Sequence, residues 1–412
     1  MMLPILACAA STVMIGGDPT APTVAPGPAW SEPPVETLSG TGETLLEPPE
    51  GELFGSSILP IELLIGGDAW RSLQRDGATW AEAQLRYEDW EGPVALHIKG
   101  SSTWTDIDDK PSLTVDVNRV LPDQEFMGVK RFNLHNQLYD PSMMSEQLSY
   151  GVLAAAGLPA PRSGYARLTI NGDDYGLYSV VEALNDDWLE RNFTDPNGNM
   201  YENTEAYCDV HERWCLEAEE TDEGGDEALV RLGDAAVLEG DAWLGAVPPL
   251  LNWERFIDQL AVEVLIAHWD SYSYDLSNYH IYHEPTVDQW SILTQSMDLD
   301  FGYRPWSYPD CGQYGTDPAR YNMGILAERC LALSDCREAW RAQLVVRAEW
   351  LGSLDLAGEV RALDERIRDD VRSDRRRNFS DREYEEHIAC VQQWVERRPA
   401  EILAWVAADR SG

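Results

Sequence analysis

The chain has 412 residues, of which 44% are hydrophobic and 25% charged, as in a globular protein long enough for two packed lobes. Its 31 basic and 72 acidic residues give a net charge of −41, which argues against nucleic acid or an anionic membrane surface as partner, because both would be repelled. No stretch approaches the ~20 apolar residues that a membrane span needs.

The N-terminal residues 1–17 are apolar and small, as in the leader of an exported protein. They contain the sequence ILAC, which resembles a bacterial lipobox, although no basic region precedes it. A lipidated Cys8 would attach the chain to a membrane; plain secretion and a chance match are the alternatives. Residues 18–55 are rich in Pro, Gly, Thr and Glu and predict a disordered linker.

Six of the seven cysteines lie beyond the leader, and an even number in an exported chain suggests disulfides. Cys208 and Cys215 are close in sequence, so we expect them to pair with each other. The pairing of the remaining four stays open: Cys311, Cys330, Cys336 and Cys390. A zinc site is the rival interpretation, but the spacings do not fit the usual zinc-ligand pattern.

Strand signals dominate the first part of a predicted small lobe over residues 56–184, in the segments SILPIELLI, VALHIKG and SLTVDV. Asp140 and Pro141 then predict the start of a helix, with Asp as N-cap and Pro at the first helical position. This helix should stop at Gly157. A hairpin is expected at the Asn-Gly pair that begins at Asn171.

A mainly helical large lobe is predicted over residues 185–412, and its acidic, cysteine-containing segment 203–246 looks like a surface insertion. The segment NWERFIDQLAVEVLIAHW has apolar residues at helical spacing and predicts a buried helix. Two short strands, NYHIYHE and WSILTQSMD, should follow it. The expected fold class is therefore α+β.

The chemistry-bearing residues follow that buried helix and its two strands: Asp270, Asn278, Asp298 and Asp300. Asn and Asp oxygens are the ligands that Mg²⁺ takes while leaving positions for phosphate. A separate Asp can orient a hydroxyl and accept its proton. Protein kinases use this order of residues for phosphoryl transfer. Turn residues arising by chance are the simpler interpretation.

Several segments together resemble the CotH (spore coat protein H) kinase family over residues 56–405. They are LHIKGSSTWTDIDDKPSLTVDV, the block from KRFNLHNQLYDPSMMSEQLSYG to INGDDYGLYSVVEAL, GNMYE, HWDSYSYDLSNYHIY and WSILTQSMDLDFGY. The resemblance implies a divergent, bilobal protein-kinase-like fold. It also implies transfer of the ATP γ-phosphoryl group, with Mg²⁺ or Mn²⁺, to Ser or Thr of an extracellular protein.

The resemblance also implies roles for single residues. Asp270 resembles the catalytic base, and Asn278, Asp298 and Asp300 resemble the metal ligands, with the principal ligand of the Asp pair left open. Lys110 is the candidate for the lysine on the ATP phosphates, and Glu146 could pair with it. The remaining candidates on the nucleotide are Lys99, Gly100, Ser101, Ser102 and, at the adenine-contacting hinge, Glu182.

Departures from the kinase pattern keep other functions open. Trp269 stands where ordinary kinases have Arg, the interval between Asp270 and Asn278 is longer, and no G-x-G-x-x-G loop is present. One alternative is a non-catalytic surface or coat protein with the same fold. The other is a carbohydrate-active enzyme with Asp298 and Asp300 as acid and base, although such carboxylates usually need a wider separation.

Overall fold

The computed structural model describes residues 52–204, 207–221, 226–303 and 315–409. The chain divides into the units Met1–Glu36 and Thr37–Gly412, and all described residues belong to the second. The expected leader with Cys8, most of the expected linker, and Cys311 lie outside the described residues. At the linker's end, Leu53 and Phe54 are buried in the core of the neighbouring strands, so the packed part begins before residue 56.

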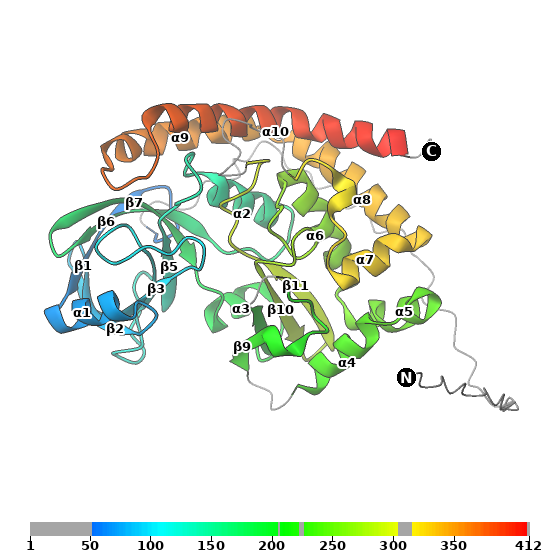
Figure 1. Ribbon diagram of the computed structural model, residues 1–412, viewed down its shortest axis with the longest axis horizontal. Coiled ribbons are helices and arrows are strands. Elements are labelled where there is room, and N and C mark those ends of the chain that lie inside the picture. The colour runs from blue at the N-terminus through cyan, green and yellow to red at the C-terminus, as the bar shows by residue number, and fades with distance from the viewer. Residues whose placement is uncertain (1–51, 205–206, 222–225, 304–314, 410–412) are drawn as a thin grey trace, which may run out of the picture. The chain divides into compact units, whose positions relative to one another are not determined.

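Seven strands of the described chain hydrogen-bond in the order β1-β2-β3-β4-β5-β7-β6 (Figure 1). β1 pairs in parallel with β6, and this pairing closes the strands into a barrel. A short helix, α1 (Gly67–Arg75), connects β1 to β2. The strand bounds are β1 Ile58–Ile65, β2 Ala81–Tyr87, β3 Trp90–Lys99, β4 Ser112–Asp116, β5 Arg131–His135, β6 Ser163–Ile170 and β7 Asp173–Glu182.

The hairpin between β6 and β7 is where the sequence predicted it. Asn171 and Gly172 have φ angles of +53° and +85°, and an Asn-Gly pair accepts this left-handed backbone at low cost. The Asn171 side chain also accepts a hydrogen bond from the Ile65 backbone N–H at 2.8 Å. The turn is therefore tied to the end of β1.

The helix after β5 begins later than the sequence predicted. α2 spans Ser145–Ala155, so Pro141 lies outside it. Asp140 is still the residue that organises the turn, because its carboxylate accepts hydrogen bonds from the backbone N–H groups of Ser142 and Ser145 at 2.9 and 2.8 Å. The Asp satisfies backbone donors before and at the helix start without being the N-cap itself.

A second sheet has the antiparallel order β11-β10-β8-β9. The predicted insertion is part of it, because β9 pairs with β8 along one side. The strand bounds are β8 Asn199–Asn203, β9 Leu216–Thr221, β10 Tyr279–Glu284 and β11 Gln289–Thr294. The helices are α3 Asp186–Asn192, α4 Glu227–Ala236, α5 Gly240–Ala246, α6 Trp253–Ile266, α7 Ile325–Ala332, α8 Ser334–Ser353, α9 Leu356–Ser373 and α10 Asp381–Asp409.

Two large hydrophobic cores occupy different parts of the described chain. One lies within the barrel and includes Val115, Phe132 and Val180. The other joins the helices with the second sheet and includes Leu260 and Trp340. Helix α2 precedes β6 and β7 in sequence, yet its buried face belongs to the second core. The expected α+β class is confirmed, and α2 packs with the helices that follow the barrel.

Disulfides take up the cysteines for which zinc was the alternative. Cys208 is bonded to Cys215, as expected, and Cys330 is bonded to Cys336. A sulfur in a disulfide has no thiolate to offer a metal, so these four residues are not zinc ligands. Within the described ranges, no helix combines the length and apolar character needed to cross a membrane.

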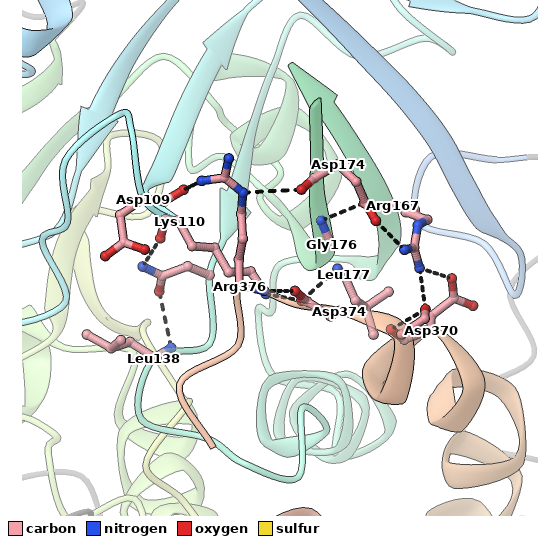
Figure 2. A network of polar contacts seen from close by, with 12 residues as sticks. Asp109, Lys110, Leu138, Arg167, Asp174, Gly176, Leu177, Asp370, Asp374 and Arg376 are labelled. Atoms are coloured by element: carbon pink, nitrogen blue, oxygen red, sulfur yellow. Dashed lines mark hydrogen bonds and ion pairs between the residues drawn. The ribbon is translucent and has the colours of Figure 1, made fainter. Parts of the chain in front are cut away.

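The segment between α9 and α10 is bound to the barrel by buried polar contacts (Figure 2). Lys110 Nζ, in the loop before β4, lies 2.5 Å from Asp374 Oδ2, and the two side chains are 6% and 2% exposed. Asp374 Oδ2 also accepts a hydrogen bond from the Leu177 N–H on β7, at 3.1 Å. Arg376 donates to the backbone carbonyls of Asp108 and Asp109.

Gly176 makes the approach of this segment possible. Its φ is +85°, and a Cβ at this position would lie 2.0 Å from Asp374 Cγ. Any side chain at position 176 would therefore displace the Asp374 carboxylate. Around it, α9 packs on β7, and α10 packs on α8 and α9 (Figure 1). The C-terminal helices are thus fixed to the barrel through β7 and the Lys110 loop.

We expect Asp374→Ala to lower the free energy of unfolding by about 3–5 kcal/mol, because it leaves the Lys110 ammonium buried without its partner. The double variant Lys110→Met/Asp374→Met should recover much of that loss. Denaturant titration of the full chain measures both. Asp68→Ala is the matched control, since Asp68 pairs with Arg71 but is 99% exposed, and it should cost ~0–1 kcal/mol. Equal effects of Asp374→Ala and Asp68→Ala would contradict this role.

Candidate active site

A cavity of about 380 Å³ lies where residues of the barrel meet residues of α2 and the second sheet. Most of the residues around it are polar or charged. They are Lys99, Gly100, Ser101, Ser102, Thr103, Ser112, His135, Asn136, Gln137, Tyr139, Glu146, Glu202, Asn203, Thr204, Asp270, Asn278, Gln295, Ser296, Asp298 and Leu299. Eight of the predicted site residues are among them, from segments as far apart as residues 99 and 298.

On the barrel side, three side chains form a continuous polar chain. Lys99 is the last residue of β3, and its Nζ lies 3.1 Å from His135 Nε2 at the end of β5. His135 Nδ1 lies 2.7 Å from Glu146 Oε1, in the first turn of α2. Burial opposes ionisation of Glu146, but contacts with His135 and the nearby Lys99 charge outweigh it and lower the carboxyl pKa.

The loop after β3 lies beside this chain. Gly100 has a φ of +104°, and a Cβ there would lie 2.6 Å from Thr103 Oγ1, so the tight turn requires glycine. The Ser102 carbonyl accepts a hydrogen bond from the Tyr139 hydroxyl at 2.8 Å. The Thr103 carbonyl accepts one from Asn136 at 3.2 Å. The predicted phosphate loop therefore borders the cavity in a fixed conformation.

Asp270 and Asn278 face the cavity from the segment between α6 and β10. α6 ends at Ile266, and its C-cap Ala267 adopts a left-handed φ of +54° that turns the chain toward this segment. Asn278 Nδ2 donates to Asp270 Oδ2 at 2.6 Å and to the Asp270 carbonyl at 3.1 Å. Burial raises the pKa of Asp270, while nearby His268 and the bond from Asn278 act in the opposite direction. The amide thus orients the carboxylate.

Asp298 follows β11 and borders the cavity with its side chain half-buried. Burial raises the pKa of its carboxyl well above the ordinary value, and the nearby carboxylates of Glu146, Asp140 and Asp270 raise it further. Among the described residues, no side chain donates a hydrogen bond to it. A carboxylate that lies among other carboxylates without a donor is suited to a bound cation.

Asp300 does not border the cavity, although it is two residues from Asp298. It is fully buried, its Oδ1 lies 2.8 Å from His268 Nδ1, and it accepts a hydrogen bond from Ser149 on α2. The next residue, Phe301, donates its N–H to the Ile266 carbonyl at 2.7 Å, which fixes this turn to the end of α6. Of the two aspartates, only Asp298 faces the space that a ligand could occupy.

The expected Lys110–Glu146 pair is wrong. Lys110 pairs with Asp374, and Glu146 contacts His135, so the strand-end lysine next to Glu146 is Lys99. Sequence order suggested Lys110 because it comes shortly before β4, but the Lys110 side chain is bound to Asp374 of the C-terminal segment.

Glu182 is also not among the residues around the cavity. Its carboxylate is 4% exposed and forms ion pairs with Arg162 and Arg191. These two guanidiniums occupy the carboxylate oxygens that a nucleotide would need, so the contacts of Glu182 are with the protein itself.

Sequence reasoning missed His135, which joins Lys99 to Glu146, and Gln137, which donates to the other Glu146 oxygen. It also missed Glu202 on β8, which accepts a hydrogen bond from Gln295 at 2.9 Å. Only the alternation in the segment KRFNLHNQL carried a signal, because it places His135 on the opposite face of β5 from the buried Phe132 and Leu134.

The polar groups fit a divalent cation held partly by another ligand. Within the described ranges, no cluster of three or more His, Cys, Asp or Glu side chains is arranged to bind a metal. The Asp298 carboxylate and the side-chain amide oxygen of Asn278 are hard oxygen donors beside the same cavity. A cation here would need further oxygen ligands, such as phosphate oxygens.

The buried pair of His268 and Asp300 gives the fold a pH dependence. Burial disfavours the imidazolium, but the Asp300 carboxylate outweighs burial and raises the pKa of His268 to about 9. Because this pKa lies above the ordinary ~6.5, the pair stabilises the folded chain fully below about pH 6.5. That stabilisation is lost as the pH rises through about 9.

We therefore expect the free energy of unfolding to fall between pH 6.5 and 9.5 in the wild type and to fall less in His268→Gln. Denaturant titrations at several pH values measure the difference. His283→Gln is the control, because His283 contacts Asp288, whose side chain is 57% exposed. Parallel pH curves for the wild type and His268→Gln would show that the pair does not carry the dependence.

Comparisons with known proteins place this site in a family. The family model described as CotH kinase protein matches residues 96–402, more than half of the chain. "Invasin CotH2" of Rhizopus delemar is 22% identical over 268 residues, covering 59% of this chain and 45% of that protein. "Invasin CotH3" of the same organism is 22% identical over 283 residues, covering 63% and 47%. The chain spans less than half the length of these curated relatives.

Among solved structures, the crystal structure of the Helicobacter pylori proinflammatory kinase CtkA matches over 81% of this chain and 92% of its own, with 10% identity and a TM-score of 0.27. A likeness this weak carries no argument about fold or function. The family match covers the barrel from β3 onward, the cavity and the C-terminal helices. The chain belongs to the CotH kinase protein family.

Proposed function

We propose that this chain is an atypical protein kinase that transfers the γ-phosphoryl group of ATP to a Ser or Thr hydroxyl of another protein. The observation that carries the proposal is the convergence of two sets of residues on one cavity. Lys99 and the Gly100–Ser102 loop come from the barrel, and Asp270, Asn278 and Asp298 come from the segments around β10 and β11. Phosphoryl transfer needs both sets, one for phosphate binding and one for the hydroxyl.

The barrel residues are suited to bind and orient the phosphates. Lys99 brings a positive charge to a cavity whose acidic residues are Glu146, Glu202, Asp270 and Asp298. The loop from Gly100 to Ser102 offers backbone N–H groups and hydroxyls, which are common phosphate ligands. In an acidic chain with a net charge of −41, such local donors are necessary for any polyphosphate to bind.

Asp298 and Asn278 would hold Mg²⁺ or Mn²⁺. When bound, such an ion neutralises negative charge on the phosphates. The carboxylate of Asp298 contributes negative charge that attracts the cation, and the nearby carboxylates of Glu146 and Asp270 add to this negative charge. Asn278 has two contacts to offer. Its Nδ2 donates a hydrogen bond to Asp270, and its Oδ1 is left for a cation.

Asp270 is the residue suited to act as general base. The Asn278 amide holds one carboxylate oxygen, and burial raises the pKa, which makes the carboxylate a better proton acceptor. In the proposed step, the acceptor hydroxyl gives its proton to Asp270 as its oxygen bonds to the γ-phosphorus. The bond from that phosphorus to the β-phosphate bridging oxygen breaks, and ADP leaves.

The two hydrophobic cores support a bilobal, kinase-like arrangement, with the cavity bordered by residues of the barrel and of the helical part. The surroundings of Asp300 do not favour a carbohydrate-active enzyme with Asp298 and Asp300 as acid and base, because Asp300 is fully buried and bonded to His268. A non-catalytic surface or coat protein is the remaining alternative, and the activity measurement below decides it.

We place the acceptor protein outside the cell, with the chain secreted or attached to a surface through Cys8. The disulfides Cys208–Cys215 and Cys330–Cys336 support this part of the proposal, because disulfides persist in oxidising compartments. The curated relatives are named invasins, a name that fits proteins acting at a surface.

We expect the full chain to transfer label from γ-labelled ATP to protein with Mg²⁺ or Mn²⁺, and Asp270→Ala to lower the rate about 10²-fold or more. Asp234→Ala, an exposed aspartate on α4, is the matched control and should keep the wild-type rate. If the wild type transfers no label and calorimetry finds no metal-dependent ATP binding, the kinase proposal fails and a non-catalytic role takes its place.

Substitutions of the two neighbouring aspartates should affect phosphoryl transfer and the free energy of unfolding differently. Asp298→Asn should abolish labelling yet raise the free energy of unfolding in metal-free buffer, because it removes a carboxylate that burial and its neighbours disfavour. Asp300→Asn should instead lower the free energy of unfolding, since it breaks the buried pair with His268. Labelling and denaturant titration of both variants test the assignment, and the reverse pattern would make Asp300 the metal ligand.

A further inference from the structure

We propose that His135 is a positioning residue that fixes Lys99 at the phosphate-binding side of the cavity by bridging it to Glu146. This inference rests on the proposed function and names a part of that site which ordinary kinases do not use. In protein kinases, the strand lysine and the helix glutamate form an ion pair directly. Here a histidine lies between them, with contacts of 3.1 Å to Lys99 Nζ and 2.7 Å to Glu146 Oε1.

The partners of His135 assign its hydrogen atoms. A carboxylate only accepts hydrogen bonds, so Nδ1 facing Glu146 carries the proton. An ammonium only donates, so Nε2 facing Lys99 accepts. A neutral imidazole with the proton on Nδ1 is therefore the one form that satisfies both contacts. The His135 ring therefore fixes Lys99, at the end of β3, relative to Glu146 on α2.

Glu146 is a fixed anchor for this bridge. Its side chain is 1% exposed, and its second oxygen accepts a hydrogen bond from Gln137 Nε2. It lies in the first turn of α2, where the helix dipole favours a negative charge. With both oxygens bound, the carboxylate is held in one position. His135 is thus held on one side, while its other nitrogen faces the cavity and Lys99.

Lys99 needs such a restraint because several carboxylates attract it. Burial lowers the pKa of its ammonium, while Glu202, Glu146, Glu219 and Asp298 act in the opposite direction. A lysine side chain has many accessible rotamers, and without His135 it could turn to Asp298 and occupy the carboxylate that we assign to the metal. The bridge therefore keeps Lys99 available to phosphate and Asp298 available to a cation.

The test measures the affinity of the full chain for a non-hydrolysable ATP analogue with Mg²⁺, by calorimetry. We expect His135→Phe to weaken binding about tenfold, the effect of one charge-assisted hydrogen bond.

Two further variants complete the design. His135→Gln can donate and accept through its amide, so it should recover part of the affinity that His135→Phe loses. His97→Phe is the matched control, because His97 is also a half-buried barrel histidine but bonds the Ile98 carbonyl away from the cavity. Thermal unfolding of each variant shows whether it is folded. If His135→Phe is not folded, His135→Gln takes its place as the test variant.

The outcomes separate this inference from the proposed function. If the wild type binds no nucleotide, the kinase proposal fails, and the role of His135 falls with it. If the wild type binds the analogue and folded His135→Phe binds it equally well, the positioning role is overturned while the kinase proposal stands. A loss that His135→Gln does not reduce would mean that His135 only supports the fold.

Discussion

The buried ion pair between Lys110 and Asp374 joins the barrel to the segment between α9 and α10, and it constrains how the two parts of the chain sit together. Both parts border the cavity, the barrel through residues such as Lys99 and the rest of the chain through Asp270 and Asp298. A buried charge without its partner is strongly destabilising, so separating the barrel from this segment is costly. Gly176 is part of the same constraint, because only a residue without Cβ admits the Asp374 carboxylate.

Within the cavity, the carboxylates are separated by what they contact. Glu146 is hydrogen-bonded by His135 and Gln137, and Asp300 is hydrogen-bonded by His268 and Ser149. Asp298 has no such donor among the described residues, and burial with like charges raises its pKa. The difference follows from local contacts and explains how neighbouring aspartates of one motif can have separate functions, one in ligand binding and one in stability.

Much of the candidate site could be predicted from the sequence. The order of buried helix, Asp270, Asn278 and the Asp298–Asp300 pair predicted side chains that meet at the ends of two strands, and three of these four border the cavity. The hairpin at Asn171 followed from backbone preferences. The start of α2 was misplaced because Asp140 bonds backbone groups over several residues instead of capping a helix directly. The alternation along β5 placed His135 on the face opposite the buried Phe132 and Leu134, but it did not show which residues that face meets.

By itself, the sequence determined the α+β class, most strands, the buried helix α6 and the residues around Asp270, because these follow from periodicity and turn chemistry within short segments. Only the tertiary structure decided which lysine lies near Glu146, which aspartate faces the cavity, and where α2 packs. Lys99 and Lys110 both adjoin strands, and Asp298 and Asp300 adjoin each other, so sequence position does not distinguish them. Their contacts do, since His135 lies beside one lysine and Asp374, 264 residues along the chain, beside the other.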